Sequence, residues 1–271
     1  MKKLLCALML IALLAGSAAA GTHRVGILSE LNMTEEEFQT YMDAALASGS
    51  WTIFSTVELE PVSFKFYNSL IALQMALNAG EIDEITLPAA VAEYLLNTTP
   101  GYAVSSISRT EPVRFAFGFR KSDGSALRDK FNDTLMSMKG DGTLVLLQSK
   151  YIAGSGVSEP KPVKFEKYND VDTIKVAVTG DLPPIDFVAA DGTPAGFNTA
   201  VIAEIGKRLH MNIELLDIEA GARAAALASG RSDVVFWFKV YTGDPQPDVP
   251  EGIVLSEPYY EWNEYLHICK K

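Results

Sequence analysis

The stretch TIKVAVTGDLPPIDFVAADGTPAGFNTAVIAEIGKRL, residues 173–209, predicts a strand, a tight turn and a helix in succession. The apolar run 174–178 suits a buried strand, the Asp191-Gly192 pair suits a turn, and residues 198–209 have the apolar spacing of a helix. The pattern continues with a strand, a helix and a strand, predicted at residues 212–216, 222–228 and 233–238. These elements form one unit of the chain, which begins at Val171.

An N-terminal unit shows the same alternation of strands and helices. An apolar strand is predicted at 23–28, and a helix follows it, because Asn32 or Thr34 can cap and three glutamates fill the first turn. The pattern continues with a helix, a strand and a helix at residues 67–77, 82–86 and 88–96. Alternation of this kind implies a mostly parallel sheet covered by helices.

Between these units, a strand is predicted at 113–120 and helices at 127–138 and 143–151. Residues 153–170 mix glycine, serine and proline with charged residues, which predicts a linker.

The N-terminal residues of the chain suggest an exported protein. Residues 1–20 have two lysines, an apolar run and a final Ala-Ala-Ala, which predicts a cleaved signal peptide and a periplasmic location. A retained membrane anchor is the alternative. Cleavage would leave Cys269 as the only cysteine, so no internal disulfide is expected. The net charge of −11 argues against nucleic acid and anionic membranes as partners.

Five stretches of the chain resemble the extracellular solute-binding proteins of family 3, the periplasmic amino-acid-binding type. They are residues 76–85, 127–152, 180–198, 226–235 and 255–260. The resemblance implies an α/β fold of the periplasmic-binding-protein type. Such a fold has two lobes, each a mostly parallel sheet flanked by helices, and a ligand bound between them for uptake by an ABC transporter.

The order of these stretches suggests a circular permutation, because residues 66–152 resemble the end of such a protein and residues 172–238 its beginning. Lobe two would then span residues 21–118 and lobe one residues 119–260, including the linker, and residues 261–271 would return to lobe two. We expect residues 265–269 to form a buried strand of the sheet that contains residues 25–28. The alternative is two half-domains that need a partner chain or exchange elements.

The contacts that this family uses for amino acids are not retained. The resemblance implies an arginine after the strand at 233–238 and an acid after the strand at 84–86, but no arginine follows Arg231 and Leu87-Pro88 stands where the acid is expected. Residues 29–32 replace the expected Gly-Thr-Thr turn. The resemblance therefore favours the fold and not amino-acid binding in the usual manner.

Candidate ligand-binding residues lie where the carboxyl ends of the strands would meet. They are Asp181, Leu182, Phe187, Trp237, Phe238, Tyr259, Asn32 and Leu87. The aromatic members predict a stacking platform for a flat or apolar ligand, and the alternative is that they fill the core. Arg223 and Lys239 could hold an anion or point to solvent.

The function expected from these features is the binding of one small molecule by a monomer that serves a transporter permease. No catalytic residue, metal site, cofactor or nucleic-acid partner is expected, and the three histidines, expected to be solvated or capping, lack metal-ligand spacing. Two alternatives stay open. One is an enzyme, a dehydratase or lyase, that uses Asp181, Asp186 or Glu219, and the other is a sensory or structural module whose cleft is plugged by Trp237 and Phe238.

Overall fold

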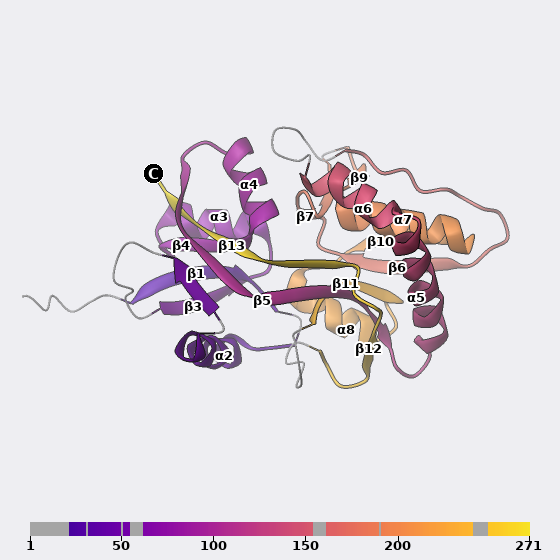
Figure 1. Cartoon of the computed structure of the whole chain (residues 1–271), viewed down its shortest axis with the longest axis horizontal. Helices are drawn as coiled ribbons and strands as arrows, with labels where there is room; N and C mark the ends of the chain where they lie inside the picture. The colour runs from indigo at the N-terminus through magenta and orange to yellow at the C-terminus, as the bar shows by residue number, and fades with distance from the viewer. Residues whose placement is uncertain are drawn as a thin grey trace, which may run out of the picture.

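A computed structural model of the chain describes residues 22–30, 32–49, 51–54, 62–153, 161–189, 191–240 and 249–271. Ten described strands form one sheet in the order β10-β6-β11-β5-β13-β4-β1-β3, and β2 and β12 both pair with β5 (Figure 1). Its strands are β1 (His23–Leu28), β2 (Trp51–Phe54), β3 (Val62–Tyr67), β4 (Glu84–Pro88), β5 (Tyr102–Arg120), β6 (Thr173–Val178), β10 (Asn212–Asp217), β11 (Val234–Val240), β12 (Ile253–Leu255) and β13 (Tyr260–Lys270). A small second sheet contains β7 (Asp181–Leu182), β8 (Asp186–Val188) and β9 (Pro194–Ala195).

The large sheet has two parallel parts joined by two long antiparallel strands. Strands β3, β1 and β4 are parallel neighbours, and so are β10, β6 and β11. Strands β5 and β13 pair antiparallel to each other and run through the middle of the molecule (Figure 1). We call β1, β3 and β4 with their helices the β1 half, and β6, β10 and β11 with theirs the β6 half. The two halves therefore share one continuous, mixed sheet.

Helices cover both faces of the sheet in each half. The β1 half carries α2 (Glu35–Ser48), α3 (Leu70–Ala79) and α4 (Ala89–Thr98). The β6 half carries α5 (Ser125–Gly140), α6 (Thr143–Gln148), α7 (Phe197–Leu209) and α8 (Arg223–Ala228), with short turns of other helix types at Ser149–Ala153 and Ala220–Ala222. In the β1 half, α2 packs Phe38 and Met42 on one face, and α3 and α4 cover the other face.

Local sequence signals explain where α2 and α3 begin and end. Thr34 caps α2 through a capping box with Glu37, which settles the choice between Asn32 and Thr34. Ser69 caps α3, and Gly80 ends it in the left-handed conformation, with φ of 74°. The helix predicted at 67–77 thus begins later than expected, because residues 62–67 form β3, a strand that the sequence analysis missed.

The C-terminal strand lies where the sequence predicted it. β13 pairs with β4, Ile268 facing Ile85, and β4 pairs with β1, Val25 facing Glu84. Residues 265–269 and 25–28 therefore belong to the same sheet with one strand between them. Ile268 is fully buried, so the prediction of a buried C-terminal strand in this sheet is confirmed.

The core of the β6 half is aromatic. Phe115, Phe117 and Phe119 alternate along β5 and pack against α5 and α7 through Phe131 and Phe197. All five side chains are fully buried. The alternation has the period of a strand with one face buried, which is why the sequence predicted this part of β5.

Candidate functional site

The halves meet where the loops after their parallel strands face each other. Ser29 and Glu30 follow β1, and the Lys239 ammonium of β11 forms an ion pair with the Glu30 carboxylate. Gly221, between β10 and α8, approaches the β1 half so closely that an added Cβ would lie 3.2 Å from Asn68 Oδ1 and 3.7 Å from Ser29 Cβ. We call this region the junction. Because carboxyl ends of parallel strands are where α/β folds bind ligands, the junction is the candidate site.

Asp181 joins the halves through the start of α3. Its Oδ2 accepts a hydrogen bond from the backbone N–H of Leu70 at 2.7 Å. Ser69 Oγ accepts from Ala72 N–H at 3.1 Å, so two free amides at this helix end are satisfied. Burial raises the pKa of Asp181 to about 6, and the negative charges of Asp186 and Asp217 add to the rise. Asp181 is thus a carboxyl group whose charge changes near neutral pH.

The segment that follows Asp181 lies in the core of the opposite half. Leu182 and Ile185 pack with Leu73, Leu87 and other side chains of the β1 half, and Ile185 is fully buried. Figure 1 places β7 at the boundary between the halves. The junction is therefore filled at this point by apolar side chains of the chain itself.

Asp186 directly follows Ile185 in this segment and is buried. Thr179 donates to its carboxylate from the hydroxyl at 2.9 Å and from the backbone at 3.3 Å. Burial raises the pKa of Asp186, while the charge of Arg223 and the two hydrogen bonds act against the rise. Arg223 is itself only 5% exposed, which corrects the prediction that it points to solvent. Glu219, the third acid considered for an enzyme, is exposed.

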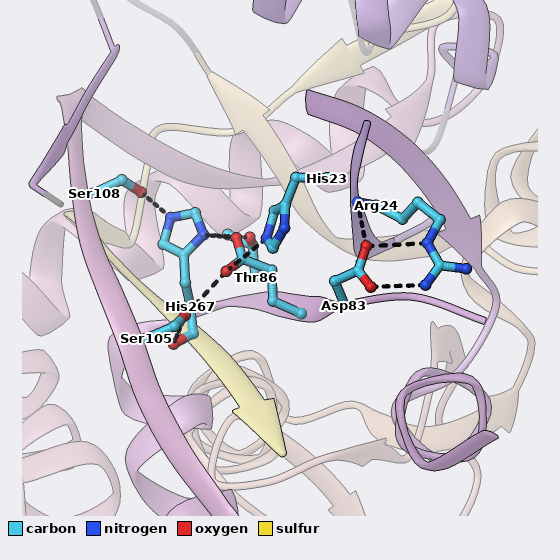
Figure 2. Close-up of polar contacts among 8 residues, drawn as sticks. His23, Arg24, Asp83, Thr86, Ser105, Ser108 and His267 are labelled. Atoms are coloured by element: carbon cyan, nitrogen blue, oxygen red, sulfur yellow. Dashed lines mark hydrogen bonds and ion pairs between the residues drawn. The ribbon is translucent and has the colours of Figure 1, made fainter. Parts of the chain in front are cut away.

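A second polar cluster crosses four neighbouring strands of the β1 half and the central pair (Figure 2). His267 Nδ1 lies 2.7 Å from Glu84 Oε1, and His267 Nε2 lies 2.9 Å from Ser108 Oγ. His23 Nε2 lies 3.2 Å from Glu84 Oε2, and Ser105 donates to that oxygen at 2.9 Å. A carboxylate can only accept, so Nδ1 carries a proton and Nε2 of a neutral ring accepts from Ser108.

The centre of this cluster, formed by Glu84, Ser108 and His267, is buried, whereas Ser105 is exposed and His23 is half-buried. Burial raises the pKa of Glu84, but the hydrogen bond and charge of His267, with those of His23, outweigh it and hold the pKa below its ordinary value. The order Ser108, His267, Glu84 is that of a nucleophile, a base and an orienting acid. However, Ser108 has no exposed surface. The cluster therefore stabilises the sheet and presents no nucleophile to a substrate in this conformation.

His210 is exposed at the C-cap of α7, as the sequence analysis expected of the histidines, but His267 is not solvated. His267 is 2% exposed and sits inside the sheet cluster. Sequence reasoning missed Glu84 and Ser108 as well. The available signal was period-two spacing, since Glu84 and Thr86 alternate with the apolar Ile85 and Leu87 along β4.

The structure separates the predicted ligand-binding residues. Leu87 and Phe238 are fully buried and Tyr259 is 3% exposed. Phe238 packs on Gly118, while Tyr259 stacks on Phe117 at 4.3 Å and donates to Asn198 Oδ1 at 3.0 Å. These side chains fill the core and do not line a platform, which is the alternative that the sequence analysis left open.

The other predicted residues lie in different places. Asp181 and Leu182 are at the junction, and Leu182 shares a core with Leu87. Phe187 is half-buried on β8, opposite Asp181 in register. Asn32 is exposed. The side chain of Trp237 lies outside what the structure describes.

The described residues form neither a metal-binding cluster nor a membrane-spanning helix. Across the ranges given above, no three or more His, Cys, Asp or Glu side chains are grouped so that they could hold a metal ion. Within the same ranges, no helix has both the length and the apolar character needed to cross a membrane. The predicted signal peptide, residues 1–20, lies outside these ranges.

Comparison with known proteins gives one family match. The family model of bacterial extracellular solute-binding proteins, family 3, matches residues 174–245. No curated protein was found that matches the chain.

Solved structures that match the chain include the GluR0 ligand-binding core with L-glutamate, at 11% identity and a TM-score of 0.39, covering 94% of this chain and 86% of that one. The ligand-binding component of an ABC-type import system from Staphylococcus aureus with zinc bound has 10% identity and a TM-score of 0.45, covering 92% of this chain and 66% of that one. An ancestral arginine-binding protein bound to arginine has 15% identity and a TM-score of 0.40 over 93% and 85%. Over residues 174–245, which include β6, α7, β10, α8 and β11, the chain has the sequence pattern of a family 3 extracellular solute-binding protein, which supports a ligand-binding role.

Proposed function

We propose that this protein is an exported solute-binding protein that takes up one small molecule at the junction and delivers it to an ABC-type membrane transporter. The observation that carries the proposal is the arrangement of the two halves. Each presents the carboxyl ends of parallel strands to the same junction, and the halves are joined through the long strands β5 and β13. Bending of such connections is a common way for two lobes to open and close around a ligand.

The chain order fits a circular permutation of the family. Strand β1 belongs to the β1 half and the C-terminal strand β13 pairs with β4 of that half, as expected if the new ends lie in lobe two. We propose lobe boundaries at residues 21–118, 119–260 and 261–271. Much of the proposed linker, residues 154–160, lies outside the described residues, but Val163 N–H donates to Pro194 O at 2.8 Å on the β6 half.

Charge at the junction favours a ligand with a cationic group. Asp186 and Asp217 lie close enough to Asp181 for their negative charges to oppose its ionisation. A cation bound beside them would relieve this repulsion. Lys239 is already paired with Glu30. We therefore propose a small organic cation or a zwitterion, held mainly by acids of the β6 half.

Thermal unfolding of the purified protein with a panel of metabolites tests this function. A ligand at a hundred times its Kd stabilises the native state by about 2.7 kcal/mol, which raises the midpoint measurably. We expect cationic compounds to give the shift, and Asp181→Asn to reduce it. Asp172→Asn, which removes an exposed carboxylate of the same half, is the matched control. A broad panel that shifts no midpoint contradicts the proposal.

A second candidate function is favoured by the packing of Leu182 and Ile185. A module whose junction stays filled would act through its surface and bind nothing small. Its plug would be these two side chains, in place of the Trp237 and Phe238 considered from sequence. Failure of every compound in the panel, together with strong protection of the junction amides from hydrogen exchange, would favour this function over the first.

A further inference from the structure

Residues 181–186 belong to one half of the molecule by their connections and to the other by their packing. The Phe197 and Asn198 amides, at the start of α7, donate to Pro184 O at 2.9 Å and Ile185 O at 2.8 Å, which fixes the backbone to the β6 half. The side chains of Leu182 and Ile185 nevertheless lie in the core of the β1 half. The segment therefore connects the halves through apolar contacts.

A polar contact reinforces this packing at the edge of the segment. The Asp181 carboxylate accepts from Leu70 N–H, at the first residue of α3. A negative charge at a helix N-terminus is favourable, and α3 has no acidic side chain of its own in the first turn. Asp181, from the β6 half, thus supplies a hydrogen-bond acceptor to α3; this hydrogen bond lowers the pKa of Asp181, but burial raises that pKa by more.

We propose that residues 181–186 form an intramolecular plug, which holds the junction closed by inserting Leu182 and Ile185 into the β1 half and must withdraw before a small molecule can enter. This inference rests on the proposed function, since it assigns the entry point of that ligand. The plug is a local element. Its withdrawal breaks the Asp181 contact and exposes two apolar side chains, while the remaining core of each half stays packed.

The Asp181 carboxyl makes the plug sensitive to pH. The groups that face it are the Asp186 and Asp217 carboxylates and the Leu70 amide, and the Arg223 guanidinium offsets the charge of Asp186. In the closed form the pKa of Asp181 is about 6, raised from 3.8 mainly by burial. Withdrawal returns the carboxyl to water and to its ordinary pKa. The closed form thus binds the proton more tightly than the open form. Acid therefore favours closure, and withdrawal becomes easier as pH rises from about 4 to about 6, with little further change above that.

Hydrogen exchange of the Leu70 amide in the ligand-free mature protein tests the plug. Relative to the intrinsic rate at each pH, we expect exchange to be about tenfold faster near pH 7.5 than near pH 5, which is the linkage expected for a pKa that moves from 3.8 to about 6. Asp181→Asn should remove most of this difference, because an amide oxygen can still accept from Leu70 but cannot ionise. Asp172→Asn should keep the wild-type difference.

A packing variant separates plug withdrawal from general loss of stability. Leu182→Ala should speed Leu70 exchange at both pH values and leave their ratio unchanged. Leu135→Ala, which truncates a fully buried side chain in the core of the β6 half, is the matched control. The plug is refuted if the exchange rate of the wild-type Leu70 amide, relative to its intrinsic rate, is the same at both pH values. It is also refuted if Leu182→Ala speeds this exchange no more than Leu135→Ala does.

The outcome also separates the plug from the proposed function. Exchange of Leu70 is measured without ligand, so a pH-dependent plug in a protein that no metabolite stabilises would leave the plug standing and overturn the ligand-binding proposal. If a metabolite stabilises the protein but Leu70 exchange does not depend on pH, the ligand-binding proposal stands and the plug is refuted.

Discussion

Glu84 and His267 lie on the neighbouring strands β4 and β13, with Glu84 Oε1 and His267 Nδ1 2.7 Å apart in a buried site. His23 of β1 approaches the other carboxylate oxygen at 3.2 Å. One carboxylate in β4 therefore contacts the first strand of the chain and the last one. The contact fixes the position of the C-terminal strand more specifically than apolar packing alone, since a shift of β13 would separate the buried His267 ring from Glu84 Oε1.

Replacement of Glu84 by glutamine should destabilise the fold. Glutamine has one acceptor oxygen in place of two, so either the buried His267 ring at Oε1 or His23 and Ser105 at Oε2 lose their acceptor. We expect the free energy of unfolding in urea to fall by about 1–3 kcal/mol. Glu93→Gln, on the exposed surface of α4, is the control. Equal stability of the two variants would show that the cluster contributes nothing.

The ion pair between Arg24 and Asp83 should contribute to acid sensitivity. Arg24 donates to both carboxylate oxygens, at 3.0 and 2.7 Å, and holds the pKa of Asp83 at about 2. Because the pKa in the folded state is below the ordinary value, the stabilisation is present above about pH 4 and is lost as pH falls toward 2. More than a third of each side chain is exposed, so the effect should stay below about 1 kcal/mol. Urea unfolding of Asp83→Asn at several pH values should show a smaller decline in this window than the wild type; a steeper decline would contradict the assignment.

Lys239 and Glu30 should be strongly coupled across the junction. The Glu30 side chain is only 4% exposed, and the Lys239 ammonium is its cationic partner. Lys239→Met would leave a buried carboxylate without a cation, with an expected loss of about 3–5 kcal/mol. The double variant that adds Glu30→Gln should recover much of this loss. A double-mutant cycle measured by denaturant unfolding checks this coupling. If the changes in the free energy of unfolding are additive, the pair is not coupled.

Gly118 should not tolerate a larger residue. It lies on β5 directly against the ring of Phe238, so an added Cβ would collide with that ring. We expect Gly118→Ala to destabilise the protein by about 1–3 kcal/mol. Gly140→Ala is the matched control, because nothing lies within 4 Å of its added Cβ at the end of α5. The control should be neutral or slightly stabilising. Equal unfolding midpoints for the two variants would exclude the collision.

Several elements could be predicted from local sequence because local chemistry specifies them. The apolar run of β6, the helix α7 and the alternating phenylalanines of β5 show their own periodicity. By contrast, β3 was missed because residues 62–67, VSFKFY, interleave polar and apolar side chains and run into a helix without a clear break. The extent of β5 was also underestimated. Residues 102–112 carry many serines and charges, which a strand tolerates only because β13 and β2 pair with it.

The candidate site was the least predictable part. Asp181 and Leu182 were singled out as ligand-binding candidates, but the residues that they contact lie far earlier in the chain, at Leu70 and Leu87. No pattern within a segment indicates such a contact. Likewise, Phe238 and Tyr259 have the composition of a binding platform, and only the packing around Gly118 and Phe117 places them in the core.

The sequence by itself determined the alternation of strands and helices, because periodicity, caps and apolar runs act over a few residues. The order of its family-like stretches indicated the return of the C-terminal strand to the sheet. Only the tertiary structure decided which polar groups are buried together and what fills the junction. Hydrogen bonds such as those of Glu84 and Asp181 depend on segments that meet only after the chain has folded, so their geometry and their pKa values are properties of the assembled sheet.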